Sequence, residues 1–363
     1  MRTTFHVILP LLMSAGLTAG ELKFRHAVDR EFTEEGAALA KGTIEEIASG
    51  STHTSAWASC EFPFNEVLVS WNVDVPVGGG FAVELRFGRE PEGAIASAWY
   101  HLGRFGSHPA VEKPVTEDDG GKVDVDCFHA KGFYRSVQYR LRLLNPSPGA
   151  AVASVEGKTR LRRMTVLVSN SPGNPELSAK FGRAKSPLRE AKPIRLEVPF
   201  RSQKAEDASI RGRICSPTSV TMLLAYRGTD CTTTEVAARA FDKDHDIYGN
   251  WPANIQAAYS LGAPGRIARF RSWDAARERV AAGQPIVISI RDKLGALKGA
   301  PYPKTDGHLL VLTGFDAYGN VCVNDPAAVD AAQGVAVYDR EQMEEVWLNQ
   351  GGVAYLIEPR ATP

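Results

Sequence analysis

The periodicity of apolar residues changes halfway along the chain, and this change limits the fold. Before about residue 170, short segments alternate apolar and polar residues between Gly- and Pro-rich turns, as half-buried antiparallel strands do. After about residue 195, apolar residues recur at helical spacing first and in strands later. A chain of 363 residues is long for a single core. The pattern therefore predicts two domains of different class.

The first half predicts an all-β sandwich or jelly-roll domain over residues 21–170. Its turns carry residues such as Pro76, Gly78 to Gly80 and Gly120-Gly121. The predicted strands cover residues 66–71, 81–87, 122–128, 137–143 and 163–168. A Pro-, Gly- and Ser-containing segment, residues 171–194, is predicted to be the linker.

The second half, residues 195–360, predicts an α+β domain with helices on an antiparallel sheet. Its helices show start and stop signals: Thr232 to Glu235 has the form of a capping box, and Gly228, Gly262 and Gly283 each follow a helical segment. The predicted helices cover residues 217–226, 232–241, 252–261 and 273–282. The predicted strands cover residues 285–290, 308–315, 321–324, 334–338 and 353–357.

The first 20 residues have the form of a secretory signal peptide. Arg2 precedes an apolar stretch from Val7 to Leu17, and small residues end the segment at Gly20. No later stretch approaches the ~20 apolar residues of a transmembrane helix. The chain is therefore expected to be secreted, periplasmic or in the cell envelope, with no integral membrane segment after cleavage.

Charge and cysteine content narrow the function further. Lys+Arg and Asp+Glu balance at 42 each, which argues against nucleic acid as a partner. Five cysteines in an exported chain leave at least one thiol unpaired. A disulfide between Cys60 and Cys127 is expected, with Cys215 as a free thiol. Pairing of Cys231 with Cys322 stays open.

Three residues of the second half point to nucleophilic chemistry. Cys215 stands at the start of a predicted helix, where free N–H groups and the helix dipole stabilise a thiolate. His308 lies on a predicted strand, and Asp325 lies at the end of the next one. If residues 316–318 form the loop, the register brings His308 opposite Asp325 to within about one residue. A carboxylate there, or the Asn324 amide, would hold the histidine by its Nδ1 hydrogen.

Each of these residues alone has an ordinary structural explanation, as a buried thiol, a hydrogen-bonded histidine or a turn-forming aspartate. Their combination favours function, because His245 and His308 are the only histidines after the linker. His245 lies in a charged run and is the weaker base candidate. Gln203, upstream of the thiol, would supply an amide donor to an oxyanion, with a solvated loop residue as its structural alternative.

These residues carry a family resemblance. Residues 195–358 resemble the papain-like cysteine peptidases of the bacteriocin leader-processing, or double-glycine peptidase, group, and more closely its free-standing exported relatives. The resemblance rests on Gln203, Cys215 to Ser219, Gly249 to Pro252, Gly307-His308 and Asn324 to Pro326. The interval from Gln203 to Cys215 is longer than in the leader peptidases, and no transporter region or ATPase follows. The first half resembles jelly-roll modules that precede such domains, through Val69 to Asn72 and the aromatic cluster from Trp99 to Phe105.

The resemblance implies a papain-like domain with Cys215 as nucleophile, His308 as base, Asp325 as orienting residue and Gln203 as oxyanion donor. The expected activity is hydrolysis of a peptide or amide bond, including peptides of peptidoglycan, without metal or cofactor. A transpeptidase would use the same residues. Trp251 and Tyr302 are candidates to line the cleft.

The alternative is a catalytically inactive protein that binds a cell wall or glycan through the first domain. Sugar stacking would then use aromatic residues of that domain, namely Trp57, Trp71, Trp99 and Tyr100.

Overall fold

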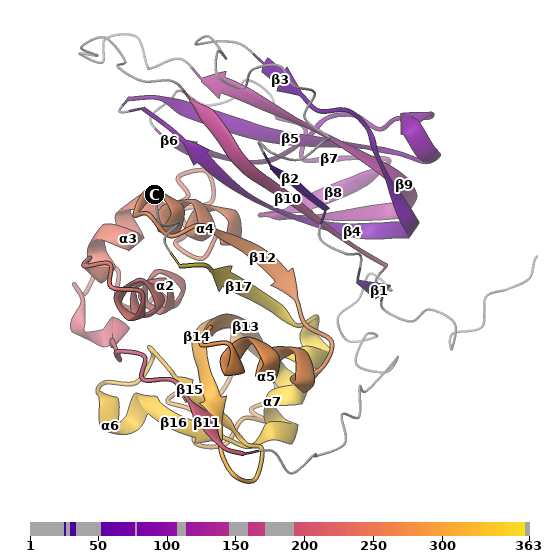
Figure 1. Ribbon diagram of the computed structural model, residues 1–363. Coiled ribbons are helices and arrows are strands. Elements are labelled where there is room, and N and C mark those ends of the chain that lie inside the picture. The colour runs from indigo at the N-terminus through magenta and orange to yellow at the C-terminus, as the bar shows by residue number, and fades with distance from the viewer. Residues whose placement is uncertain are drawn as a thin grey trace, which may run out of the picture.

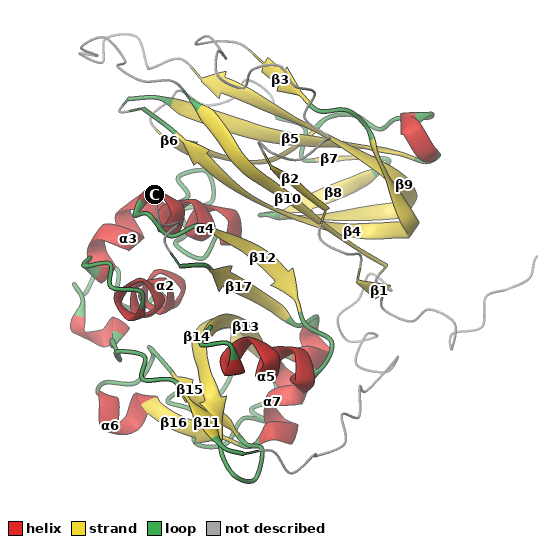
Figure 2. Cartoon of the chain, in the orientation of Figure 1, coloured by secondary structure: helices red, strands yellow, loops and turns green. Residues whose placement is uncertain are grey.

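A computed structural model describes residues 25–26, 30–33, 52–76, 78–106, 114–144, 159–170 and 192–359. The predicted signal peptide, residues 1–20, and most of the predicted linker lie outside the described residues. Figures 1 and 2 show a layered all-β part above a part in which helices surround a second sheet. No helix in the described ranges is long and apolar enough to cross a membrane.

The N-terminal domain is built on a ten-stranded antiparallel sheet with the main order β1-β10-β4-β9-β5-β6. Its central strands, β4 and β9, are long and carry register shifts, so each pairs with different neighbours along its length. The strands are β1 (Arg25–His26), β2 (Arg30–Thr33), β3 (Thr52–Thr54), β4 (Ala58–Asp74), β5 (Gly80–Gly88), β6 (Tyr100–Gly106), β7 (Glu117–Asp118), β8 (Gly121–Asp124), β9 (Cys127–Leu144) and β10 (Arg160–Asn170).

The predicted strand over residues 122–128 is two strands. A turn at Val125-Asp126 separates β8 from β9, and Asp124 pairs with Cys127 across it. Val125 has φ +58°, in the left-handed region that a β-branched residue rarely adopts, so the sequence gives little warning of a turn here. This turn matters because it presents Asp126 to the second domain.

The core of the N-terminal domain contains aromatic residues that the glycan-binding alternative requires at the surface. Trp71 and Tyr100 are 1% and 0% exposed, and both belong to this core. The rings of Trp57 and Trp99 both lie against the Arg86 guanidinium, at 5.0 and 4.6 Å from its carbon. Trp71 and Tyr100 are therefore unavailable for sugar stacking.

The expected disulfide between Cys60 and Cys127 is wrong. The register of β4 and β9 places Leu68 opposite Cys127, eight residues along β4 from Cys60. Strands rise about 3.4 Å per residue, whereas a disulfide needs Cα atoms within about 7 Å. Neither Cys231 nor Cys322 forms a disulfide either, and both are buried.

The C-terminal domain is α+β, with helices packed on a seven-stranded antiparallel sheet of order β12-β17-β13-β14-β15-β16, to which β11 adds at β14. Four of its helices are those predicted: α2 (Cys215–Tyr226), α3 (Thr233–Ala240), α4 (Trp251–Ser260) and α5 (Trp273–Ala281). The strands are β11 (Ile194–Arg195), β12 (Gly265–Arg269), β13 (Ile286–Asp292), β14 (Thr305–Phe315), β15 (Val321–Asn324), β16 (Val335–Tyr338) and β17 (Val353–Ile357). The helices α6 (Ala331–Gly334) and α7 (Arg340–Val346) complete it.

Except for α2, each α-helix of this domain begins with a side-chain cap. Thr232 accepts a hydrogen bond from the Glu235 N–H at 3.1 Å, which confirms the predicted N-terminal cap of α3. Asn250 caps α4 in the same way through the Ala253 N–H. The sheet separates two cores: α2, α3 and α4 cover one face, and α5 and α7 cover the other.

The two domains meet along β4 and β12. Ser70, Asn72 and Val73 of the first domain bond to the backbone of Ile267 and Gly265 and to the side chain of Gln256. Leu68 and Leu167 pack into the core on the α2 side of the second domain. The N-terminal domain is therefore docked on the C-terminal domain by backbone-directed hydrogen bonds and apolar contacts.

Candidate active site

Cys215 is the first residue of α2, where the helix has no side-chain cap of its own. The N–H groups of Leu309 and Ser216 donate to the thiol. Backbone donors and the helix dipole at this position favour the thiolate. The thiol also hydrogen-bonds to His308, so α2 and β14 meet at these two side chains.

His308 lies on β14 and links the thiol to a carboxylate. Its Nε2 is 2.8 Å from Oδ1 of Asp325. Nε2 is thus engaged by the carboxylate, which leaves Nδ1 for the sulfur. The sequence-based expectation had assigned Nδ1 to the carboxylate, and this assignment is wrong.

The strand register explains the difference. β14 and β15 pair Phe315 with Val321, so the loop covers five residues, 316–320, and a register shift follows between Leu312 and Gly314. Val311 then lies opposite Asn324, which places Asp325 nearest Leu310, two residues from His308. The ring must reach diagonally along the sheet, within the range of a long side chain. It does so with Nε2, its more distant nitrogen.

Asp325 is fully buried and is held from several directions. Its Oδ1 accepts from His308 and, at 2.9 Å, from the Ala327 N–H. Its Oδ2 accepts from the hydroxyl groups of Tyr302 at 3.1 Å and Tyr338 at 2.9 Å. A buried carboxylate with this many donors keeps its charge and its position.

Tyr302 and Tyr338 thus orient Asp325. The Tyr302 ring also stands edge-on to the His308 ring, with centroids 4.8 Å apart. Tyr302 was expected to line a cleft, whereas Tyr338 had no signal in the sequence, because its contact with Asp325 depends on how β16 pairs with β15. The other proposed holder, Asn324, donates to the Val198 carbonyl instead.

The electrostatics favour a thiolate and an imidazolium. Burial opposes ionisation of Cys215, but its contact with His308 and the backbone donors outweigh burial and lower the pKa of the thiol below 9.0. Burial also opposes the charged form of His308, yet Asp325 and Cys215 raise its pKa to about 10. Burial disfavours the Asp325 anion, but His308 holds the pKa of that carboxyl below its usual value. These shifts favour charges that alternate in sign along Cys215, His308 and Asp325.

Gln203 is buried beside the same strand end, not solvated in a loop. Its backbone N–H donates to the Pro326 carbonyl at 2.9 Å, next to Asp325. Its side-chain Nε2 donates to the Arg211 carbonyl at 2.8 Å, while Oε1 makes no hydrogen bond within the described part of the chain. The segment between Gln203 and Cys215 therefore folds back so that Arg211 contacts the Gln203 amide.

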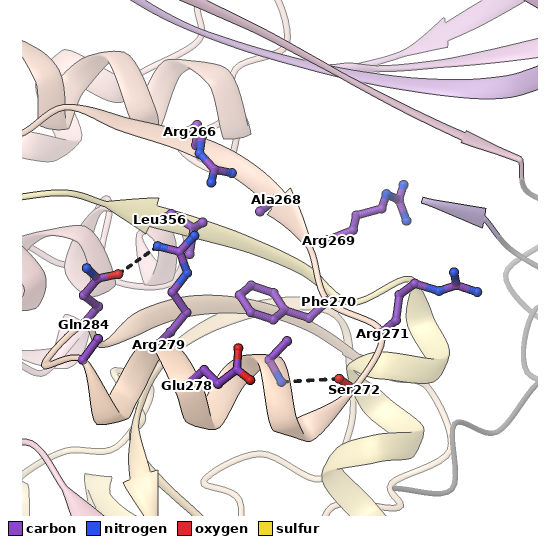
Figure 3. A pocket seen from close by; sticks show the side chains of 12 residues that line it. Arg266, Ala268, Arg269, Phe270, Arg271, Ser272, Glu278, Arg279, Gln284 and Leu356 are labelled. Carbon is purple, nitrogen blue, oxygen red and sulfur yellow. Dashed lines mark hydrogen bonds between the residues drawn. The ribbon is translucent and has the colours of Figure 1, made fainter. Parts of the chain in front are cut away.

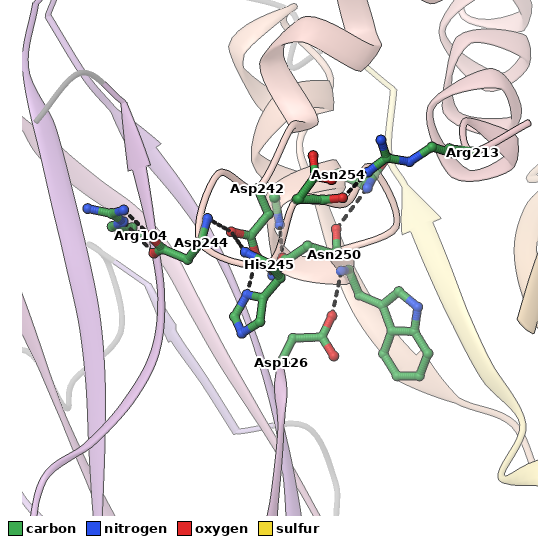
Figure 4. A network of polar contacts seen from close by, with 11 residues as sticks. Arg104, Asp126, Arg213, Asp242, Asp244, His245, Asn250 and Asn254 are labelled. Atoms are coloured by element: carbon green, nitrogen blue, oxygen red, sulfur yellow. Dashed lines mark hydrogen bonds and ion pairs between the residues drawn. The ribbon is translucent and has the colours of Figure 1, made fainter. Parts of the chain in front are cut away.

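The loop of residues 242–250 links this segment to the N-terminal domain (Figure 4). Arg213 contacts Asp246, and its guanidinium lies against the Tyr248 ring. On the other side, Arg104 forms an ion pair with Asp244. The loop is thus held from both domains, and one of the residues that hold it, Arg213, stands two residues before Cys215.

Two other sequence candidates lie in or beside this loop. The His245 ring contacts Asp242 at 2.8 Å, and the side chain is 42% exposed, so it belongs to the loop and not to the Cys215 cluster. Trp251 donates its backbone N–H to the Asp126 carboxylate at 2.6 Å, and its side chain packs against the core below α2. Trp251 therefore serves the domain contact and the core.

A separate pocket of about 650 Å³ lies between β12 and α5 (Figure 3). Arg266, Phe270 and Arg279 are among its lining residues, and Arg279 is hydrogen-bonded to Gln284. None of the predicted site residues lines it. The described residues contain one group of potential metal ligands, made of His, Cys, Asp or Glu side chains, with suitable spacing. It lies in the N-terminal domain and consists of Glu66, Cys127 and His129.

Comparison with known families agrees with the resemblance read from the sequence. Residues 195–355 match the model of the Peptidase_C39 like family, and residues 18–167 match the Peptidase C39 N-terminal domain. No curated protein matches the chain significantly.

Solved structures also match. A putative C39-like peptidase from Bacillus anthracis is 22% identical, with 47% of this chain and 100% of that chain covered and a TM-score of 0.37. A double glycine motif protease from an AMS/PCAT transporter, in complex with its leader peptide, is 20% identical (47% and 99% covered, TM-score 0.32). The peptidase domain of Streptococcus ComA, an ABC transporter, is 15% identical (45% and 99% covered, TM-score 0.34).

Proposed function

Because residues 195–355 belong to the C39-like peptidases and residues 18–167 are a C39 N-terminal domain, we propose that this chain is an active cysteine peptidase with Cys215 as its nucleophile. The observation that carries the proposal is the position of His308 between the Cys215 thiol and the buried Asp325 carboxylate. A solely structural histidine has no need of both partners. We take the C-terminal domain as papain-like and the N-terminal sheet as a jelly-roll-like sandwich.

In the proposed reaction the Cys215 thiolate attacks the carbonyl carbon of the substrate. The Cys215 N–H and the remaining Gln203 amide hydrogen donate to the oxyanion that forms. The His308 imidazolium then gives its proton to the leaving amine as the C–N bond breaks. Water, deprotonated by His308, attacks the thioester, and the acid product leaves with regeneration of the thiolate. An amine in place of water would give transpeptidation by the same steps.

We propose that the enzyme acts outside the cytoplasm on peptides, including those of peptidoglycan. The signal-peptide-like residues 1–20 support export. The N-terminal domain would contact the cell wall or a glycan through surfaces other than its core aromatics. No step of the reaction requires a metal or an organic cofactor.

Turnover of a peptide library by three proteins tests this proposal: wild type, Cys215→Ala and Cys231→Ala. Cys231 is another buried free thiol, outside the cluster of Cys215, His308 and Asp325, so its replacement is the matched control. We expect turnover by wild type and Cys231→Ala, and none by Cys215→Ala with an unchanged circular dichroism spectrum. Equal cleavage by Cys215→Ala would contradict the proposal. Folded wild type without turnover of any library member would support the inactive binding protein instead.

A further inference from the structure

A second group of reactive side chains lies on the N-terminal domain. Cys127 and His129 are two residues apart on β9, so both point to the same face of the sheet. Glu66 lies directly opposite His129 on β4, and its side chain therefore shares that face. The sequence separates Glu66 from the other two by some 60 residues, and only the strand register brings the three together.

The three side chains have the spacing of metal ligands. One nitrogen, sulfur or oxygen atom from each lies within 4.8 Å of the others. Glu66 Oε2 is 3.6 Å from His129 Nδ1. Zinc bonds of about 2.0–2.3 Å in a tetrahedron place neighbouring ligand atoms about 3.4–3.6 Å apart. The carboxylate and the imidazole already have this separation. A rotation of the Cys127 side chain would bring its sulfur into the third ligand position.

Arg269 of β12 holds the carboxylate from the other domain. Its guanidinium forms an ion pair with Glu66 Oε1 and also donates to the Gly351 carbonyl. The two side chains are only 7% and 11% exposed. Because Arg269 engages Oε1, Oε2 is directed towards His129. Outer partners that fix a ligating carboxylate in this way are a common feature of metal sites.

We propose that Glu66, Cys127 and His129 bind a divalent zinc-type cation at the contact between the two domains. Thiolate, imidazole and carboxylate together suit Zn²⁺, and three protein ligands leave a fourth position for water. Binding displaces the thiol proton to solvent. The His129 side chain is 42% exposed, which gives the ion a path of entry.

This site is independent of the proposed peptidase activity. Its metal would be structural. The Glu66 carboxylate would bind the ion through Oε2 and Arg269 of β12 through Oε1, so that it would connect the N-terminal domain, the ion and β12. The bound metal is thus expected to stabilise the docked arrangement of the two domains.

Titration with Co²⁺ tests the proposal, because cobalt replaces zinc and its bond to a thiolate gives a charge-transfer absorption band. Cys215→Ala serves as the parent protein, which removes the other thiol that lies beside a histidine. We expect one equivalent of Co²⁺ to give the band in the parent, and Zn²⁺ to abolish it by competition. Cys127→Ser in this parent should lose the band, whereas Cys231→Ser should keep it.

Two further variants guard against misfolding of the Cys127→Ser protein. His129→Gln changes a partly exposed ligand, and Glu66→Gln keeps the shape of the carboxylate. Each should weaken Co²⁺ binding by more than the roughly 10- to 100-fold typical of losing an outer partner. Zn²⁺ should also raise the unfolding temperature of the parent but not of His129→Gln. A parent without a thiolate band, or a band that survives both Cys127→Ser and His129→Gln, would overturn the proposal.

Discussion

At the scale of single residues, the charge state of the pair Cys215 and His308 decides the pH dependence of activity. The thiol must lose its proton, and its pKa lies below 9.0; the imidazole must keep its proton, and its pKa is about 10. We expect kcat/KM to rise with pH as Cys215 ionises and to fall near pH 10 as His308 loses its proton.

Asp325→Asn isolates the alkaline limb of this profile. The amide oxygen can still accept a hydrogen bond from His308, but the negative charge that raises the pKa of the imidazole is gone. The alkaline limb should therefore move to lower pH, as measured by kcat/KM between pH 5 and 11. An unmoved alkaline limb in a folded variant would show that Asp325 does not tune His308.

Gln203 provides a second prediction at this scale. If its amide donates to the oxyanion, Gln203→Ala should lower kcat about 10²- to 10³-fold. Alkylation of Cys215 by iodoacetamide forms no oxyanion, so its rate should stay near that of wild type. The neighbouring exposed Lys204, changed to Ala, is the control. A parallel loss of turnover and alkylation would instead indicate that Gln203 only supports the position of the thiol.

At the scale of elements, the turn between β8 and β9 joins the domains through one buried carboxylate. Burial raises the pKa of Asp126 to about 7, although the Trp251 N–H donates to it. The folded state thus binds a proton that the unfolded chain releases near pH 4. The free energy of unfolding should fall as pH rises from about 4 to 7, by at most about 1.4 kcal/mol per pH unit from this group.

Asp126→Asn keeps an oxygen that can accept from Trp251 and removes the ionisation. Urea denaturation of both proteins between pH 4 and 8 measures the effect. The variant should gain stability relative to wild type as the pH rises through this window. Curves that run parallel across the whole range would contradict the assignment.

The elements also show what the sequence can and cannot reveal. Helix α2, like strand β15, follows from local patterns, because the periodicity of apolar residues is a local property. Strand β12 was missed, since its two arginines obscure the alternation and its pairing with β17 is a tertiary property. Asp325 could be named as a partner of His308 because hairpin partners lie near each other. Which nitrogen of His308 contacts Asp325 depends on the loop length and on a register shift, and neither can be predicted from the sequence.

At the scale of the whole molecule, contacts across the interface couple the stability of the two domains. Gln256 mimics a strand partner: its side chain accepts from the Val73 N–H at 2.9 Å and donates to the Val73 carbonyl at 2.8 Å. Gln256→Ala would leave both backbone groups buried without partners, at about 1–3 kcal/mol each. Gln284→Ala, which loses one hydrogen bond to Arg279 away from the interface, is the control.

Calorimetry measures the outcome. Wild type should unfold in one transition because the domains share an interface core, and Gln256→Ala should unfold at lower temperature or in two resolved transitions. A thermogram equal to that of Gln284→Ala would mean that the interface contributes little to the stability of the chain.

The central claim is that Cys215 is a nucleophile activated by His308, and the rate of its alkylation by iodoacetamide at pH 6 tests this most directly. Mass spectrometry of the peptide that contains residue 215 gives the rate in folded wild type, in folded His308→Ala and in urea. We predict that Cys215 reacts faster in folded wild type than in the unfolded chain, and that His308→Ala removes this advantage. A folded Cys215 that reacts no faster than the unfolded thiol would contradict the account.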